Sequence, residues 1–83
     1  MVLSDLEGDD IILCQITSRA TFDKYAIPIF ENDFLEGKLS VDSFIKPNKI
    51  FTADKNIILY RACSINKIKV NEVIEIIIKL LSI

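Results

Sequence analysis

The chain has 83 residues, of which 51% are hydrophobic and 27% charged, and its 10 basic and 12 acidic residues give a net charge of −2. This length excludes a second domain, and this composition excludes intrinsic disorder, so we expect a single domain over residues 1–83. With no His and with Cys14 and Cys63 far apart, the sequence has too few ligands for a zinc site and too few cysteines for a disulfide framework. We therefore expect two buried free thiols, no metal and no cofactor.

The distribution of apolar residues argues against a membrane protein. No apolar run reaches the roughly 18 to 20 residues that a bilayer span requires. The first residues carry acids in place of the basic segment that opens a signal peptide. These features predict a cytoplasmic protein with no membrane contact.

The first third of the chain has the pattern of two antiparallel strands. Residues 1–3 are apolar, residues 4–10 form a polar turn segment, and residues 11–17 resemble a buried strand. This pattern indicates a chain that starts inside a strand. Residues 18–24 are a polar loop, and residues 25–30 are strand-like, with Pro28 typical of a sheet edge.

The middle of the chain alternates turns and strands. Residues 31–38 are acidic and end in the turn signal Glu36-Gly37-Lys38. Residues 41–52 predict a long strand interrupted at residues 46–48, because proline cannot donate to a strand ladder. That interruption marks either the edge of the sheet or a functional site. Residues 54–56 predict another turn, and residues 57–64 a further strand.

The last segment changes to a helical period. Apolar residues recur at the spacing of an amphipathic helix at Val70, Val73, Ile74, Ile77, Leu80 and Leu81. Asn66 or a near neighbour is the expected N-cap. Ile76, Ile78 and Ile83 lie off this stripe, and β-branched residues have low helix propensity. Either this surplus apolar surface meets a partner, or the segment is a strand.

Positive charge is concentrated in one part of the sequence. Between positions 43 and 69 six basic residues are opposed by a single acid, Asp54; the six are Lys46, Lys49, Lys55, Arg61, Lys67 and Lys69. This imbalance predicts a local basic surface despite the acidic total. The alternative is that these side chains form an ordinary solvated face.

Three stretches, in this order, resemble the MazF/PemK family of toxins from toxin–antitoxin modules. Residues 13–18, Leu-Cys-Gln-Ile-Thr-Ser, are similar to the strand that ends in a hydroxyl pair beside the RNA groove of that family. Residues 43–55, from Ser-Phe-Ile-Lys-Pro-Asn to Ala-Asp-Lys, resemble its long central strand. Residues from 57 through the terminal helix resemble its closing strand and helix. Together these stretches cover nearly the whole chain.

The resemblance implies a fold, an activity and partners. The fold is α+β and mainly β, an SH3-like antiparallel barrel with a C-terminal helix, here partial because the family's amino-terminal hairpin is not matched. The activity is metal-independent endoribonuclease cleavage of single-stranded mRNA. The implied partners are single-stranded RNA, a cognate antitoxin whose acidic tail blocks the RNA groove, and a second copy of the chain in a homodimer.

The same resemblance assigns roles to particular residues. Thr17, Ser18 and Asn48 take the catalytic positions, and RNA-binding roles fall to three basic residues, Lys46, Lys49 and Arg61. Lys46 stands where the family usually has Arg, and so keeps the charge but loses the bidentate fork. Asn48 stands where Asp is usual and cannot accept a proton at neutral pH. The family's first-hairpin Arg is not matched, and these departures together predict weak cleavage.

Simpler structural explanations remain open for these residues. Thr17 and Ser18 also fit an ordinary strand end whose hydroxyls bond the backbone. Residues 46–48 also fit a simple bulge. Three functions follow: an endoribonuclease toxin, a truncated or degenerate homologue that dimerises and binds antitoxin without cutting RNA, or a generic SH3-like protein-binding module.

Overall fold

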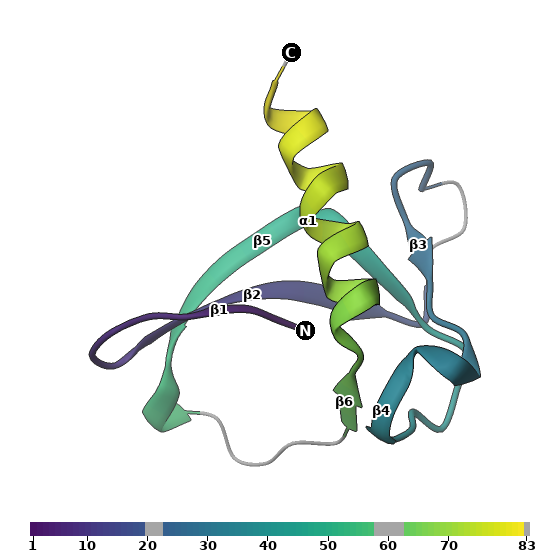
Figure 1. Ribbon diagram of the computed structural model, residues 1–83, viewed down its shortest axis with the longest axis horizontal. Helices are drawn as coiled ribbons and strands as arrows, with labels where there is room; N and C mark the ends of the chain where they lie inside the picture. Colours follow the sequence, from purple (N-terminus) through teal and green to yellow (C-terminus); the bar gives the residue numbers. More distant parts are fainter. Residues whose placement is uncertain (20–22, 58–62, 83) are drawn as a thin grey trace.

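The computed structural model describes residues 1–19, 23–57 and 63–82, which form a mainly β structure with one helix (Figure 1). A four-stranded antiparallel sheet in the order β1-β2-β5-β3 curls into a half-barrel, and β4 pairs with β6 separately. The elements are β1 (Val2–Asp5), β2 (Asp10–Thr17), β3 (Ile27–Pro28), η1 (Glu31–Asp33), β4 (Phe34–Gly37), β5 (Phe44–Asp54), η2 (Lys55–Ile57), β6 (Cys63–Ile65) and α1 (Lys67–Leu81).

The strands β1 and β2 form the predicted hairpin. Ser4 pairs with Ile12 and Asp5 with Ile11, and the connecting turn contains Gly8 at a φ of 82°. This left-handed conformation strains residues that have a Cβ atom, so glycine suits the position. The prediction of antiparallel strands on either side of a polar turn is confirmed.

The long strand β5 is central and bends near its middle (Figure 1). Its first half lies between β2 and β3, and its second half continues along β2. The strand predicted for residues 25–30 is present only as β3, whose two residues, Ile27 and Pro28, occupy the expected sheet edge. Pro28 suits this edge because its backbone nitrogen lies on the side away from β5, and the Ile29 N–H still donates to the Ser43 carbonyl at 3.0 Å.

Two parts of the predicted middle segment differ from the structure. Residues 34–37, expected only to lead into a turn, form β4, because they find a partner in β6 far along the chain. η2 occupies the start of the strand predicted for residues 57–64, and β6 begins at Cys63. Residues 58–62, including Arg61, lie outside the described residues.

The predicted C-terminal helix is confirmed, and the alternative of a strand is wrong. Asn66 is the N-cap, and its side chain accepts a hydrogen bond from the Lys69 N–H at 2.8 Å. Val73 and Ile77 are buried on the inward face, as the periodicity predicts. Leu81 lies on the same predicted stripe but is 78% exposed, because the end of α1 projects beyond the sheet (Figure 1). Within the described residues no helix is long and apolar enough to cross a membrane.

The core lies between the helix and the curled sheet. Five buried residues form it: Cys14, Ile27, Ile45, Val73 and Ile77. Ile45 and Val73 are completely buried, which ties α1 to the centre of the sheet. The expectation of two buried thiols is wrong for Cys63, which is half-buried because it lines an open cavity.

Candidate functional site

The interruption predicted at residues 46–48 is a wide bulge in β5. Cys14 pairs with Ile50, whereas the next residue of β2, Gln15, pairs with Lys46, so residues 47–49 have no partner in β2. The thiol of Cys14 donates to the carbonyl oxygen of Lys46 at 2.9 Å and holds the bulge from inside. A bulge bends its strand and re-aims the neighbouring side chains, here those of residues 46–49.

Thr17 and Ser18 lie where β2 ends. The Thr17 hydroxyl accepts from the Arg19 N–H at 3.0 Å and is 3.4 Å from the Arg19 carbonyl oxygen. This arrangement is a local hydroxyl turn, in agreement with the structural explanation for this residue. Ser18 is exposed. The backbone thus already uses one of the two predicted catalytic hydroxyls.

Lys46 has an acidic neighbour that the sequence did not reveal. Its Nζ lies 3.1 Å from a carboxylate oxygen of Asp23, and both side chains are largely covered. Asp23 also accepts from the Tyr25 N–H at 3.0 Å. The Tyr25 hydrogen bond, followed by the Lys46 bond, lowers the pKa of Asp23 below its ordinary value of 3.8. At neutral pH Asp23 therefore balances the charge of Lys46.

The strand register brings several predicted residues together. Gln15 pairs with Lys46 and Thr17 with Phe44, so Thr17 and Lys46 are diagonal neighbours, about 7–8 Å apart at such positions. Strand alternation puts them on the face opposite to Ile45. The exposed residues Asn48 and Lys49 lie in the adjoining bulge. We call this group the bulge cluster: Thr17, Ser18, Lys46, Asn48 and Lys49.

The rest of the predicted basic stretch is dispersed. Lys55 pairs with Asp5 and donates to the Leu6 carbonyl. Lys69 is buried and pairs with Asp33 and Glu72. Lys67 is exposed at the start of α1, and Arg61 lies outside the described residues, so only Lys46 and Lys49 of the predicted basic stretch lie at the bulge. Two further basic residues, Arg19 and Lys24, belong to the polar loop after β2. The sequence analysis did not count them in the basic surface, although their charge was visible in the sequence.

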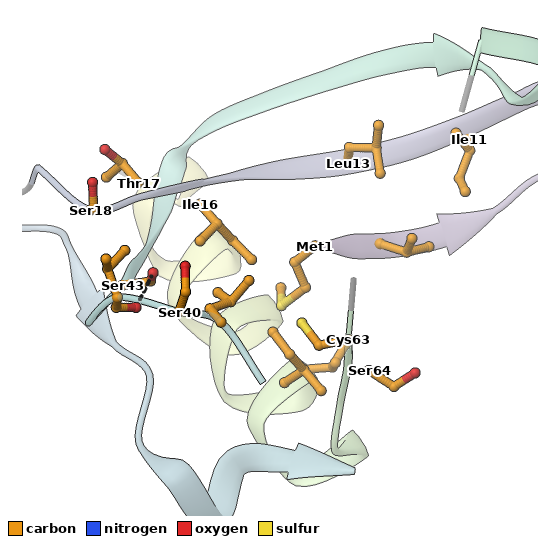
Figure 2. A pocket seen from close by; sticks show the side chains of 15 residues that line it. Met1, Ile11, Leu13, Ile16, Thr17, Ser18, Ser40, Ser43, Cys63 and Ser64 are labelled. Atoms are coloured by element: carbon orange, nitrogen blue, oxygen red, sulfur yellow. Dashed lines mark hydrogen bonds between the residues drawn. The ribbon is translucent and has the colours of Figure 1, made fainter. Parts of the chain in front are cut away.

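A cavity of about 760 Å³ opens beside the bulge cluster, on the inner side of the half-barrel (Figure 2). Figure 2 shows Ile16 pointing into this cavity, whereas Thr17 and Ser18 lie at its rim. Ser40 and Ser43 add hydroxyls near the same end. The remaining lining is mostly apolar and includes no charged side chain. Sequence reasoning did not find this cavity, because its walls come from segments far apart in the chain.

The donor atoms available around this site are hydroxyls, an amide and amines. Among the described residues no three His, Cys, Asp or Glu side chains are grouped so that they could hold a metal ion.

Comparison of the sequence with protein-family models and with curated proteins found no match to either. The geometry of the bulge cluster and of the cavity is therefore the basis for a functional assignment.

Proposed function

We propose that this protein is the toxin component of a toxin–antitoxin module, an SH3-like, MazF/PemK-like endoribonuclease that cleaves single-stranded mRNA. The observation that carries the proposal is the bulge cluster, whose two hydroxyls, amide and two lysines come from the end of β2 and from the bulge of β5, with Thr17 and Lys46 as diagonal neighbours. The half-barrel with its C-terminal helix also agrees with a partial barrel of that kind.

The chemistry requires three things of these residues. RNA cleavage without a metal needs the 2′-hydroxyl deprotonated, the charged phosphorane stabilised and the leaving 5′-oxygen protonated. In the proposed site, Lys46 and Lys49 attract the phosphate, and Ser18 and Asn48 donate hydrogen bonds to it. Thr17 joins them when its hydroxyl turns from the Arg19 backbone to the RNA. None of these groups is a strong base near neutral pH, so we expect slow cleavage.

The proposed partners follow from the same surface. Single-stranded RNA lies along the outer face of β2 and β5, where Phe44 offers an aromatic ring beside the lysines. An antitoxin with an acidic tail competes for Lys46 and Lys49. The toxin itself acts as a homodimer.

Two contacts favour a second candidate, a degenerate homologue that dimerises and binds antitoxin but does not cut RNA. The Thr17 hydroxyl is engaged by the Arg19 backbone. The Lys46 charge is balanced by Asp23 at 3.1 Å. Both groups must leave these partners before they contact a scissile phosphate. A surface of this kind still attracts an acidic peptide through Lys49 and the neighbouring basic loop.

A cleavage assay distinguishes the two candidates. We expect the purified chain to cut a single-stranded RNA oligonucleotide labelled at both ends, in EDTA, at a rate that Thr17→Ala and Lys46→Gln each lower about 10- to 100-fold. Lys79→Gln on the exposed side of α1 is the matched control and should leave the rate unchanged. RNA binding without cutting would favour the degenerate homologue. Cleavage that is equal in all variants, or an absence of RNA binding, would contradict the toxin proposal.

A further inference from the structure

The half-barrel is open between β1 and β6. Among the described strands β1 is at the edge of its sheet and pairs only with β2, while β6 pairs only with β4. The cavity lies between them, with Met1 on one wall and Cys63 and Ser64 on the other (Figure 2). The opening is thus bordered by two strands, each with one side unmatched within the described part of the chain.

The edge of β1 presents backbone groups to this opening. Met1 and Cys14 exchange two hydrogen bonds of 2.8 Å, one in each direction, so the polar groups of Met1 point toward β2. In an antiparallel ladder the next residue points its N–H and C=O the opposite way. Val2 therefore directs its N–H and C=O to the open side, and it also lines the cavity. An added strand would find a donor and an acceptor here.

The cavity accepts apolar side chains. Its wall includes Val2, Leu13, Ile16 and Val70, and its polar side chains are serines, one threonine and the thiol of Cys63. Burying a charge against such a wall without a partner would be strongly unfavourable. An occupant that bonds to β1 therefore carries apolar residues at alternate positions, which is the period of a β-strand.

The chain as a whole exposes more surface than a compact protein of its mass. The accessible surface is 6280 Å², whereas a compact monomer of 9.4 kDa exposes about 5,000 Å². The excess is larger than the roughly 800 Å² that each partner contributes to a standard protein interface.

The acidic residues beside β1 indicate which charge the occupant carries at one of its ends. The turn that follows β1 and the first residue of β2 carry three exposed acids, Glu7, Asp9 and Asp10. Asp5, at the end of β1, already pairs with Lys55. A strand that runs antiparallel to β1 has its amino end beside this acidic turn. Basic residues at that end complement the turn.

We propose that the opening between β1 and β6 is a docking groove for an extended segment of another protein. This segment adds to the edge of β1 as an antiparallel strand, inserts alternate apolar side chains into the cavity and has basic residues at its amino end. The proposal does not depend on the proposed ribonuclease function, because it uses the inner cavity and the β1 edge. The two sites meet at Thr17 and Ser18, which lie at the rim of the cavity.

The test is fluorescence anisotropy with a labelled synthetic peptide that alternates valine and threonine after two amino-terminal lysines. We expect saturable binding to the full chain. Methylating alternate backbone nitrogens of the peptide, on the side that faces β1, should weaken binding about tenfold or more, because edge hydrogen bonds are lost. Replacing the two lysines by glutamates should weaken it severalfold.

Protein variants locate the groove. Val2→Pro removes the outward N–H of β1 and keeps the bonds of Met1 to Cys14, so it should weaken peptide binding without unfolding the chain. Leu13→Thr, which alters the cavity wall, should weaken binding about tenfold, whereas the matched control Ile50→Thr, on the neighbouring strand away from the cavity, should not. The experiments that change the peptide use the unaltered protein, so they remain decisive if a protein variant fails to fold.

Three outcomes would overturn the proposal. The methylated peptide could bind as tightly as the unmethylated one, which would show that the peptide does not hydrogen-bond to the edge of β1. Dodecanoate could saturate the cavity while the peptide does not bind, which would make this a site for a small amphiphile. The chain could form a dimer that Val2→Pro dissociates, which would make a second copy the occupant of the groove.

Discussion

Cys14 shows how one small buried side chain controls the candidate site. It is 1% exposed, belongs to the core, and donates its thiol hydrogen to the carbonyl of Lys46. This bond joins the inner face of β2 to the carbonyl at the start of the bulge. The core and the bulge cluster are therefore linked through a single residue.

We expect Cys14→Ala to destabilise the fold by about 1–3 kcal/mol, because a fully buried side chain and its hydrogen bond to Lys46 are lost. Cys63→Ala is the matched control, and it should cost less because Cys63 is half-buried on a cavity wall. Urea unfolding followed by circular dichroism measures both changes. Equal losses for the two variants would show that the bond to Lys46 contributes nothing.

Burial raises the pKa of the Cys14 thiol. The pKa of the Asp23 carboxyl is lowered by its hydrogen bonds to the Tyr25 N–H and to Lys46. A carboxylate with a lowered folded-state pKa stabilises the fold above its ordinary value of 3.8 and loses this contribution as the pH falls through the folded-state pKa. We therefore expect Asp23→Asn to lower the urea midpoint at pH 7 and to have no effect at strongly acidic pH. If the urea midpoints of Asp23→Asn and the wild type still differ in acid, the ionised carboxylate is not the cause of the difference.

At the scale of elements, the start of α1 is fastened to η1. The Asn66 side chain caps the helix and donates to the Asn32 carbonyl at 3.1 Å. Lys69 is buried beside Asp33, at 3.5 Å, and lies over the Phe30 ring at 5.6 Å. These contacts fix the angle at which the helix leaves β6, and so place Val73 and Ile77 on the sheet.

We expect Asn66→Ala to cost about 1 kcal/mol, because the first turn of α1 loses its cap. Asn66→Asp is the informative comparison: it keeps the cap acceptor but loses the donor to Asn32. Thermal unfolding should rank the wild type first, Asn66→Asp second and Asn66→Ala last. An Asp variant as unstable as the Ala variant would assign the effect to the η1 contact and not to the cap.

At the scale of the whole molecule, the helix keeps an apolar side that the core does not use. Ile78 is 55% and Leu81 78% exposed, at the end of α1 that projects beyond the sheet (Figure 1). These residues lie i, i+3 apart on one helix face. The other two isoleucines of the surplus predicted from the sequence differ: Ile76 packs against the core, so the prediction is wrong for it, and Ile83 lies outside the described residues. A second copy that packs on this end of α1 would cover the exposed pair.

We expect the chain to form a homodimer at micromolar concentration through this end of α1. Ile78→Lys combined with Leu81→Lys should shift the protein to monomers in analytical ultracentrifugation, because buried lysines without partners oppose association. Ile68→Lys, at the other end of the helix and 82% exposed, is the matched control and should leave the dimer intact. A folded wild-type monomer at high micromolar concentration would contradict the prediction.

The sequence by itself determined the features that depend on local period and local chemistry. The hairpin of β1 and β2, the break near Pro47 and the capped helix follow from alternation, turn residues and helical spacing, which act between near neighbours. The mainly β class with a terminal helix could be predicted from the sequence for the same reason. Tertiary structure alone decided the pairing of β4 with β6, the Asp23 partner of Lys46, the burial of Lys69 and the cavity. Each of these joins residues far apart in the chain, and a sequence pattern carries no information about which distant side chain will fill a given space.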